Sequence, residues 1–389
     1  MYREASRILS QVQASKGTIK TLCYASRFSN KAALLGLVSE TAKHLDLLEE
    51  VIERSGIKWK MDGMLLCVLL MDQFRDMLEC GAGLKELILS NKTRLHAEWV
   101  KAKLRRSVQD ERSNISFKYA RVNTLKEGFD FSILNKATPE VLIPNLFCLP
   151  SDFPMTHPSI QSGHLIVQDK ASCLPPVVLA PTVNDVVIDA CAAPGNKTNL
   201  LSGMMKDSGA IFAFEKDQRR FKTLLETLDR AACQNVRPEC KDFLSVNPND
   251  YPQVTMIMLD PSCSGSGMPL DLERQLSKAN DTERSTERLE KLSAFQKKLL
   301  RHAMSFRGCK RIVYSTCSIH EIENERVIEE VLSECGKEWR AVEALPGWST
   351  RGAPGFPFST FVLRADPQKD RCHGFFVACL ERSEFNKNG

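Results

Sequence analysis

Val186-Val-Ile-Asp-Ala-Cys-Ala-Ala-Pro-Gly-Asn-Lys-Thr198 is the stretch that decides the fold. Its β-branched start predicts a strand that ends at Asp189, and a turn of small residues then leads into a helix expected to begin near Lys197. Such a turn lets the backbone approach a ligand closely. A phosphate loop is excluded because the upstream glycine is missing and Asn196 separates Gly195 from Lys197. The single glycine also excludes the dinucleotide pattern.

Strands and helices alternate from Pro181 onward, on both sides of this turn. The expected strands are Val186–Asp189, Ala210–Glu215, Val236–Cys240, Val254–Asp260, Arg311–Ser315 and Gly374–Leu380, and the expected helices are Lys197–Lys206, Gln218–Ala232, Leu292–Phe306 and Glu321–Cys335. This alternation predicts a parallel, doubly wound, Rossmann-like α/β sheet. Ligands of such sheets bind beyond the carboxyl ends of the strands, so this edge is where we expect the site.

The 389 residues divide into three predicted parts. Residues 1–110 carry apolar positions at helical spacing and predict a helical accessory domain. Residues 111–176 predict a small α+β module, in which Pro175 and Pro176 interrupt the last segment. Residues 177–389 hold the doubly wound sheet. Within them, Asp271–Glu290 is highly charged and poor in apolar residues, so we expect a mobile surface excursion there.

Composition and charge narrow the functional classes. Hydrophobic residues make up 43% and charged residues 26% of the chain, as in globular proteins. The longest apolar run, Met64 to Met71, is too short to cross a bilayer, and we expect no membrane association. The net charge of +5 is mild, but residues 101–121 are locally basic. Arg105 and Arg106 in that segment are candidates for contact with phosphates, the alternative being a solvated helix face.

The 14 cysteines form no Cys-x-x-Cys pair and no cluster with zinc spacing, so we expect neither a metal site nor a disulfide framework. Two cysteines stand out because each follows a strand and has small hydroxyl neighbours: Cys263 after Leu259-Asp260-Pro-Ser, and Cys317 after Val313-Tyr-Ser-Thr. A thiolate that adds to C6 of a pyrimidine makes C5 nucleophilic, and a second thiol can assist release. Asp260 could bond ring N3 and the exocyclic amine.

Acidic residues follow two further strands. Glu215 ends the second strand, where a carboxylate can accept hydrogen bonds from both hydroxyls of a ribose. Together with the small-residue turn, Glu215 suggests a cofactor that contains adenosine. Asp242 follows the third strand, where it could read an adenine edge or could simply cap the following turn.

Taken together, these motifs closely resemble the Nop/Sun family of RNA cytosine-C5 methyltransferases. The resemblance covers about Tyr119 to Leu380, and the matching segments are Arg121–Lys126, Gly163, Gln168–Ser172, Cys191–Lys197, Asp260, Cys263–Gly265, Ser315–Ser318 and Gly374–Phe376. It implies that the chain uses S-adenosylmethionine to methylate carbon 5 of a cytosine in RNA. It also implies that Cys317 is the nucleophile, that Cys263 assists product release, and that Asp260 orients the cytosine.

The resemblance assigns further residues to the cofactor and to the RNA. The cofactor residues are Cys191, Ala192, Ala193, Pro194, Gly195, Asn196, Lys197, Glu215, Arg220, Asp242 and Asp260. The module at 111–176 resembles the family's RRM-like RNA-binding appendage. We therefore expect Arg121 and Asn123 of this module to contact the substrate, and by the same resemblance Lys197 of the cofactor turn. Asn196 and Glu215 depart from the family's usual glycine and aspartate, but neither change removes a reacting group.

Some segments resemble one branch of the family in particular. Three segments are similar to those of the eukaryotic enzymes that modify large-subunit (28S/25S) ribosomal RNA. They are Ser262 before Cys263, Gly265–Met268 after it, and Gly163–Leu174. This branch implies large-subunit ribosomal RNA or its precursor as partner, and a nucleolar address in the nucleus. We also expect a monomeric enzyme.

Three alternatives stay open at this point. If the chain were a uracil-C5 methyltransferase, Cys263 would have no role in the reaction. An amino-group methyltransferase carries an Asn/Asp-Pro-Pro-aromatic run where this chain has Asp260-Pro-Ser-Cys. An RNA-binding assembly factor without activity would have no reason to keep Asp260, Cys263 and Cys317 together.

Overall fold

The computed structural model describes residues 1–389 except 15, 18, 76, 111–116, 269–281 and 384–389. The chain forms two compact units, the first built mainly from residues 1–115 and the second from residues 116–269 and 284–389. Among the described residues, no helix combines the length and the apolarity that a bilayer crossing requires.

The N-terminal unit is helical, as predicted. Its helices are α1 (Tyr2–Gln13), α2 (Ile19–Ala25), α3 (Lys31–Lys43), α4 (Leu45–Ser55), α5 (Gly63–Phe74), α6 (Ala82–Ser90) and α7 (Lys92–Asp110). Helix α5 is buried on all sides from Leu66 to Gln73, so it forms the centre of this unit. Asp62 begins α5 by accepting a hydrogen bond from the backbone N–H of Leu65 at 2.8 Å.

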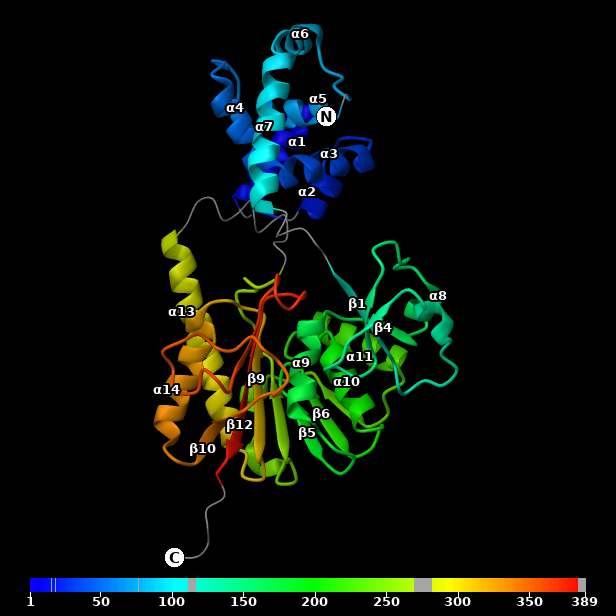
Figure 1. Ribbon diagram of the computed structural model, residues 1–389, viewed down its shortest axis with the longest axis vertical. Helices are drawn as coiled ribbons and strands as arrows, with labels where there is room; N and C mark the ends of the chain where they lie inside the picture. The colour runs from blue at the N-terminus through cyan, green and yellow to red at the C-terminus, as the bar shows by residue number, and fades with distance from the viewer. Residues whose placement is uncertain (15, 18, 76, 111–116, 269–281, 384–389) are drawn as a thin grey trace, which may run out of the picture. The chain divides into compact units, whose positions relative to one another are not determined.

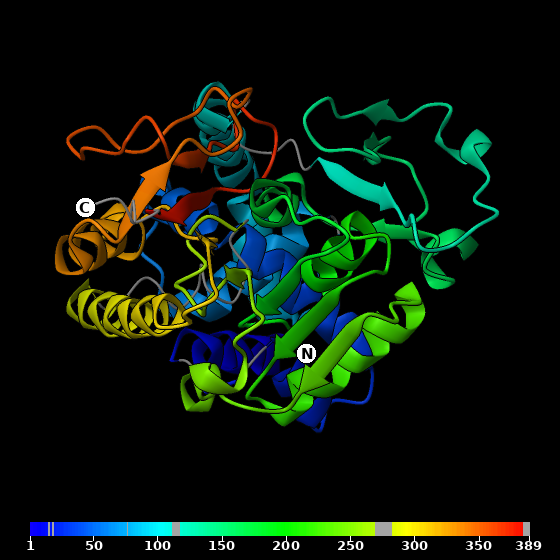
Figure 2. The ribbon, with the colours of Figure 1, turned by 90° about the horizontal axis from the view of Figure 1, so that it is seen from below.

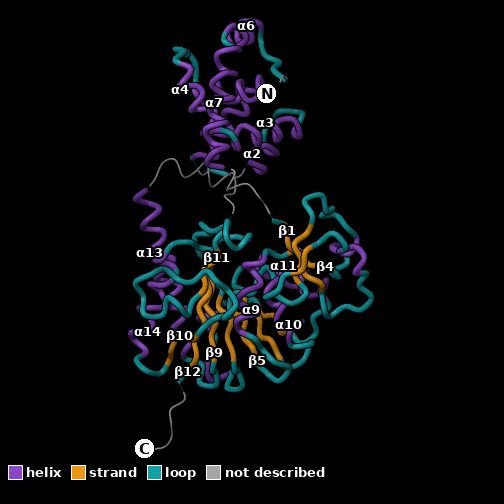
Figure 3. Tube along the Cα trace, in the orientation of Figure 1, coloured by secondary structure: helices purple, strands orange, loops and turns teal. Residues whose placement is uncertain are grey.

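The second unit contains two separate groups of strands, as Figure 3 shows. The smaller group is an antiparallel sheet in the order β2 (Thr138–Pro139), β3 (Leu146–Leu149), β1 (Lys118–Val122) and β4 (Leu165–Val167). The 3-10 helix η1 (Phe131–Leu134) and helix α8 (Pro158–Gln161) complete this module. Its own core is small and consists of Ala120, Val122, Leu134, Leu149 and Leu165.

The larger sheet has the order β10-β12-β9-β8-β5-β6-β7, with β11 paired to β12. Its strands are β5 (Val186–Asp189), β6 (Ala210–Phe214), β7 (Val236–Glu239), β8 (Met256–Leu259), β9 (Arg311–Thr316), β10 (Trp339–Val342), β11 (Leu363–Ala365) and β12 (Phe375–Arg382). Strands β5 to β9 are parallel, which confirms the doubly wound prediction. Strand β12 instead runs antiparallel to β9. No helix lies between β10 and β12 in this described stretch, and a parallel strand would need such a crossover.

Helices cover both faces of this sheet (Figure 1). One face packs on α9 (Lys170–Leu179), α10 (Asn196–Met204) and α11 (Gln218–Ala231), and the other on α13 (Thr282–Met304) and α14 (Glu325–Cys335). The strands alternate between the faces. In β5, Val187 faces the first group of helices and Ile188 the second. The 3-10 helices η2 (Phe243–Ser245), η3 (Pro248–Asp250) and η5 (Glu321–Glu323) lie in the connections.

Two helices differ from the sequence expectations. Helix α13 begins at Thr282, so the later part of Asp271–Glu290 is helical, and its residues 271–281 lie outside the described ones. The ion pair of Lys291 with Glu287 shows how charged residues are accommodated on its exposed surface. Helix α9 continues through Pro175 and Pro176 and packs against β8, β9 and β12. The predicted boundary at residue 176 therefore falls inside α9, a helix that packs on the larger sheet.

Candidate active site

The small-residue turn lies at the point where the order of the large sheet reverses. Strand β5 has β6 on one side and β8 on the other, and residues 190–195 lead from its carboxyl end into α10. Gly195 has φ +106°, and a Cβ there would lie 3.0 Å from Cδ1 of Leu224. Glycine is therefore required for the turn to pack this closely on α11. Open α/β sheets bind their ligands at this reversal point.

Asp189, the last residue of β5, belongs to this site although the sequence analysis gave it no role. Its side chain is buried, and its Oδ2 accepts a hydrogen bond from Oγ1 of Thr198 at 2.7 Å. Oδ1 is buried without a hydrogen-bond partner in the described structure. Burial raises the pKa of Asp189 to about 7. A buried acceptor left open beside a ligand-binding turn fits the cationic end of a ligand.

Glu215 and Arg220 tie the end of β6 to the same turn. Oε1 of Glu215 accepts from the backbone N–H of Asp217 at 2.9 Å, and Oε2 lies 3.3 Å from Nη1 of Arg220. Nη2 of Arg220 donates to the carbonyl of Ala193 at 2.7 Å. Arg220 thus bridges the acidic residue and the turn. Asp242, beyond β7, accepts from the N–H of Leu244 at 3.0 Å, which is the capping role considered above.

The other residues of the turn are largely enclosed. Ala192 and Ala193 are buried, whereas Pro194 is exposed and Asn196 is half-buried. Burial, reinforced by the neighbouring carboxylates, raises the pKa of the Cys191 thiol far above its usual range. Cys191 is therefore a protonated packing residue and not a nucleophile.

Asp260, just beyond β8, is held from two sides. Its Oδ2 lies 2.7 Å from Nζ of Lys197, and its Oδ1 accepts from Oγ of Ser315 at 2.6 Å. Burial alone would lower the pKa of Lys197, but the adjacent carboxylate of Asp260 raises it overall. Lys197 therefore keeps its positive charge, and the carboxylate of Asp260 is fixed in orientation between the two cysteine-bearing strands.

The two cysteines meet because their strands are neighbours in the sheet. Met258 of β8 pairs with Val313 of β9, so the residues beyond both carboxyl ends lie together. Sγ of Cys263 and Sγ of Cys317 are 3.1 Å apart, and both thiols are free, as are all other cysteines of the chain. The hydrogen bond from Cys263, helped by the charge of Lys197, lowers the pKa of Cys317. The same hydrogen bond raises the pKa of Cys263.

The loops that carry the cysteines are joined through their backbones. The N–H of Gly267 donates to the carbonyl of Cys317 at 2.9 Å, and the N–H of Gly374 donates to the carbonyl of Gly267 at 2.8 Å. A Cβ on Gly267 would lie 2.1 Å from the carbonyl oxygen of Gly374, so a side chain cannot be accommodated there. The described His, Cys, Asp and Glu side chains form no group that could hold a metal ion.

A family model described as "16S rRNA methyltransferase RsmB/F" matches residues 176–381, which is more than half of the chain. A second, described as the N-terminal domain of NOL1/NOP2/Sun domain family member 5, matches residues 32–115. A 28S rRNA (cytosine-C(5))-methyltransferase of Mus musculus is 36% identical, with 99% of this chain and 91% of the relative covered. The chain belongs to the Nop/Sun family of RNA cytosine-C5 methyltransferases. It is an enzyme of the transferase class that uses S-adenosylmethionine.

Other relatives of this methyltransferase agree with that assignment. A 25S rRNA (cytosine-C(5))-methyltransferase of Schizosaccharomyces pombe is 36% identical, with 97% of this chain and 90% of the relative covered. A methyltransferase homolog protein from Pyrococcus horikoshii has a TM-score of 0.58 and 22% identity, covering 87% of this chain and 99% of its own. NSun6 from Pyrococcus horikoshii has a TM-score of 0.55 and 18% identity, covering 74% and 96%. At these identities, the solved structures support the fold.

Two residues that we predicted to contact RNA are buried in this methyltransferase. Arg121 is 3% exposed; its Nε donates to Oε1 of Gln168 at 2.8 Å and its Nη2 to the carbonyl of Asn196 at 3.1 Å. Asn123 is 2% exposed, and its Nδ2 donates to the carbonyls of Gly163 and Ala231 at 3.0 and 2.9 Å. The prediction is corrected: their polar atoms are used inside the protein, and they fasten the small module to α10 and α11. Figure 2 shows that module beside these helices.

The remaining RNA candidates are only partly described. Nη2 of Arg105, on α7, lies 2.9 Å from Oε1 of Glu50, and the guanidinium is 41% exposed. The side chain of Arg106 lies outside the described structure. Lys197 is half-buried and paired with Asp260. RNA contact by these residues stays a prediction.

Proposed function

We propose that this methyltransferase modifies carbon 5 of one cytosine in large-subunit ribosomal RNA or its precursor, with Cys317 as nucleophile and Cys263 as the group that releases the product. The observation that carries the proposal is the pair of cysteine sulfurs that lie 3.1 Å apart beyond the carboxyl ends of two neighbouring strands, next to Asp260. The relatives from Mus musculus and Schizosaccharomyces pombe are named for 28S and 25S rRNA, which supports the choice of substrate. A monomeric enzyme in the nucleolus completes the proposal.

The residues present fit S-adenosylmethionine. Asp189 offers a buried, unpartnered carboxylate oxygen for the ammonium group of the methionine part. Glu215 is the acidic residue for the ribose hydroxyls, and Asp242 is the candidate for the adenine edge. Arg220 and Gly195 keep the turn closely packed. When bound, the cofactor supplies an electrophilic methyl group.

Cys317 begins the reaction in this proposal. Because the hydrogen bond from Cys263 lowers its pKa, a larger fraction of Cys317 is thiolate than of an ordinary cysteine at the same pH. The thiolate adds to C6 of the cytosine, which forms the S–C6 bond and moves the electron pair of the C5–C6 double bond toward C5. Asp260, held by Lys197 and Ser315, accepts a hydrogen bond from the exocyclic amine of the cytosine. This contact stabilises the adduct as C5 becomes nucleophilic.

Cys263 completes the reaction. Its pKa is raised first by the hydrogen bond to Cys317. This cause disappears once Cys317 is a neutral thioether bonded to C6, so the Cys263 proton can leave to solvent. The Cys263 thiolate then takes the proton of methylated C5, the C5–C6 double bond re-forms, and the S–C6 bond breaks to return the Cys317 thiolate. Both cysteines end in their starting states, and one proton is released for each methyl group transferred.

The test uses the purified enzyme, total ribosomal RNA from cells that lack this enzyme, and labelled S-adenosylmethionine. On a denaturing gel, we expect Cys263→Ala to trap a covalent RNA adduct and Cys263→Ala/Cys317→Ala to trap none. Methyl transfer by Cys317→Ala would overturn the role of Cys317 and favour an amino-group target. Bisulfite sequencing then locates the new 5-methylcytosine, and nucleoside analysis of the labelled RNA identifies the methylated base. Label spread over small-subunit RNA, or at uracil, would overturn that part of the proposal.

A further inference from the structure

We propose that Glu323 and Gln296 are positioning residues for Cys263. They hold the two residues that flank this cysteine and so keep its thiol where it can release the product. The inference rests on the role of Cys263 given above. Neither residue carries a reacting group, and neither was singled out from the sequence.

Glu323 holds the residue after Cys263. It is the last residue of η5, and its side chain is fully buried. Its Oε1 accepts from the backbone N–H of Ser264 at 2.9 Å, and its Oε2 accepts from Oγ of Ser264 at 2.6 Å. A carboxylate with two bonds to one residue fixes the direction of that backbone as well as its position.

Gln296 holds the residue before Cys263. It lies on α13 and is also fully buried. Its Nε2 donates to the carbonyl of Ser262 at 3.1 Å and to Oε1 of Glu323 at 3.1 Å. Ser262, Gln296, Glu323 and Ser264 therefore form a closed chain of hydrogen bonds around Cys263.

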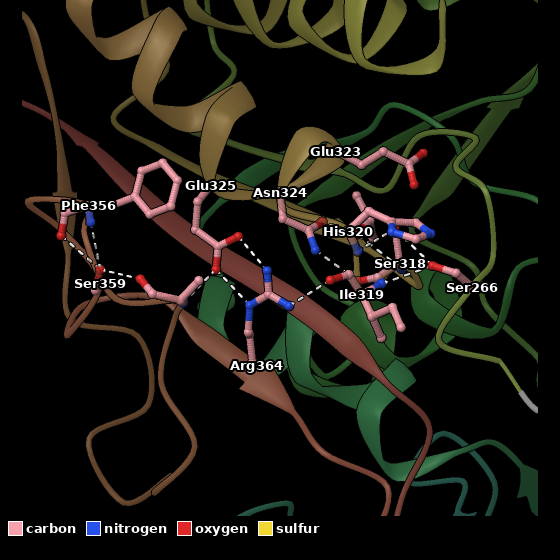
Figure 4. A network of polar contacts seen from close by, with 12 residues as sticks. Ser266, Ser318, Ile319, His320, Glu323, Asn324, Glu325, Phe356, Ser359 and Arg364 are labelled. Carbon is pink, nitrogen blue, oxygen red and sulfur yellow. Dashed lines mark hydrogen bonds and ion pairs between the residues drawn. The ribbon is translucent and has the colours of Figure 1, made fainter. Parts of the chain in front are cut away.

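We call this chain of hydrogen bonds through Ser262, Gln296, Glu323 and Ser264 the clamp. Glu323 is itself fixed to β9, the strand that leads to Cys317. The hydroxyl of Tyr314, on β9, donates to the carbonyl of Glu323 at 2.6 Å. The next residue, Asn324, donates from Nδ2 to the carbonyl of Ser318 at 2.9 Å and accepts from Oγ1 of Thr316 at 2.5 Å. Figure 4 shows Glu323 and Asn324 beside Ser318. Two consecutive residues thus hold the two cysteine loops, which fixes the sulfurs relative to each other.

The loss of the clamp has a distinctive consequence. Without the carboxylate, the buried N–H groups of Ser264 and Gln296 lose their acceptor, and the Cys263 loop must shift to find new partners. The Cys317 loop keeps its bonds to Asn324 and Gly267. Addition of Cys317 to C6 continues, although more slowly because the hydrogen bond from Cys263 is weakened, whereas release is slowed further, so covalent adduct should accumulate. A general structural defect would instead lower the amount of adduct.

The experiment compares Glu323→Ala, Glu323→Gln and Cys263→Ala in the gel assay used for the proposed function. We expect Glu323→Ala to hold roughly tenfold more adduct than wild type at steady state, because a misplacement of about 1 Å can slow a catalysed step by that much or more. Glu323→Gln should give a smaller rise, since its amide oxygen can still accept from Ser264 N–H and the Ser264 hydroxyl can turn to accept from the amide. The adduct must disappear when Cys317→Ala is added.

Glu325→Gln is the matched control. Glu325 is equally buried and close in the chain, but it pairs with Arg364 at 2.5 Å and accepts from the N–H of Ala353 at 2.8 Å. Figure 4 shows this second network. We expect Glu325→Gln to lower thermal stability without raising the adduct. If Glu323→Ala does not fold, Gln296→Met, which removes the Ser262 contact, should raise the adduct in the same direction.

The outcomes separate the two proposals. If Cys263→Ala traps adduct while folded Glu323→Ala and Gln296→Met lose turnover without trapping any, Glu323 and Gln296 only maintain the fold and the inference is overturned. If Cys263→Ala itself traps no covalent adduct, the role proposed for Cys263 is wrong. The positioning role proposed for Glu323 and Gln296 is then wrong as well.

Discussion

Nη2 of Arg121 donates a hydrogen bond to the backbone carbonyl of Asn196 at 3.1 Å, joining the first strand of the small sheet to the first residue of α10. Burial lowers the pKa of Arg121 to about 10, so the guanidinium remains charged at neutral pH. Its Nε donates to Gln168, whose Nε2 donates to the carbonyl of Ser172 at 3.1 Å. That carbonyl is free because Pro176, one turn further in α9, has no N–H. The small module and the turn before α10 are thereby held together.

Arg121→Met should destabilise both the small module and the turn that leads into α10. Removing the guanidinium leaves buried acceptors on Gln168 and Asn196, which we expect to cost about 1–3 kcal/mol of the free energy of unfolding. Binding of S-adenosylhomocysteine should weaken as well, because the turn that ends at Asn196 loses a support. Thermal unfolding and calorimetry check both effects. Lys118→Ala, an accessible cation on the same strand, serves as control and should change stability by less than about 0.5 kcal/mol. Unchanged cofactor binding in Arg121→Met would contradict the link.

Cys263→Ala should make Cys317 less reactive in the free enzyme. The alanine removes the hydrogen bond that lowers the pKa of Cys317, so the pKa rises and the thiolate fraction at pH 7 falls. Alkylation of Cys317 by iodoacetamide, followed by mass spectrometry, should slow about threefold for each unit by which the pKa rises, because the smaller thiolate fraction is partly offset by a more nucleophilic thiolate. Cys335→Ala, on α14, should leave the rate unchanged. An equal or faster rate in Cys263→Ala would show that Cys317 is activated by another group.

Cofactor binding should strengthen with rising pH. The pKa of Asp189 is about 7 in the free protein, so at pH 6 most of this carboxyl is protonated and cannot pair with an ammonium group. Between pH 6 and 7.5, the affinity for S-adenosylhomocysteine should increase about five- to tenfold as the ionised fraction grows. Asp189→Asn should bind more weakly at pH 7.5 and show a flat profile. If the affinity of Asp189→Asn for S-adenosylhomocysteine still rose with pH as in wild type, the titrating group would be a residue other than Asp189.

Arg105 tests the proposed RNA contact of the N-terminal unit. Arg105→Gln should raise the dissociation constant for RNA and reduce the salt slope by about one charge, since one phosphate contact is lost. Arg54 pairs with the same Glu50, its Nε lying 3.0 Å from Oε1, which makes Arg54→Gln a matched control. Filter binding over a range of salt concentrations measures both variants. The same result for both would indicate a diffuse charge effect, and no change for Arg105→Gln would remove it from the RNA-binding residues.

The sequence was sufficient to predict that the proposed reacting groups lie close together. Asp260, Cys263 and Cys317 directly follow parallel strands, and the carboxyl ends of such strands must meet at one edge of the sheet. The clamp could not be found in this way. Gln296 and Glu323 lie on separate elements, and no local pattern indicates that a buried glutamine of a helix will bond a carboxylate at the end of a 3-10 helix.

Arg121 and Asn123 show a different limit. Their motif marked the right region, but a motif does not state whether a polar side chain faces solvent or the protein interior. Strand β1 lies between β3 and β4, and these side chains bond to the neighbouring helices and turns. The course of α9 was missed for a similar reason. Two prolines usually end a helix, yet α9 packs against β8, β9 and β12, and the amide of Gln168 replaces the N–H that Pro176 lacks.

The contact of Gly267 with Gly374 also has a consequence for redesign. Because the two backbones touch without room for a side chain, the geometry of the cysteine loops is a property of the main chain and is present before any RNA arrives. A library that diversifies these two positions would yield mostly inactive proteins. The neighbouring Met268 and Ile319 are 41% and 51% exposed, so substitutions there should disturb the loops less than substitutions of the glycines. Attempts to move the enzyme to another RNA should therefore randomise these neighbours and leave both glycines untouched.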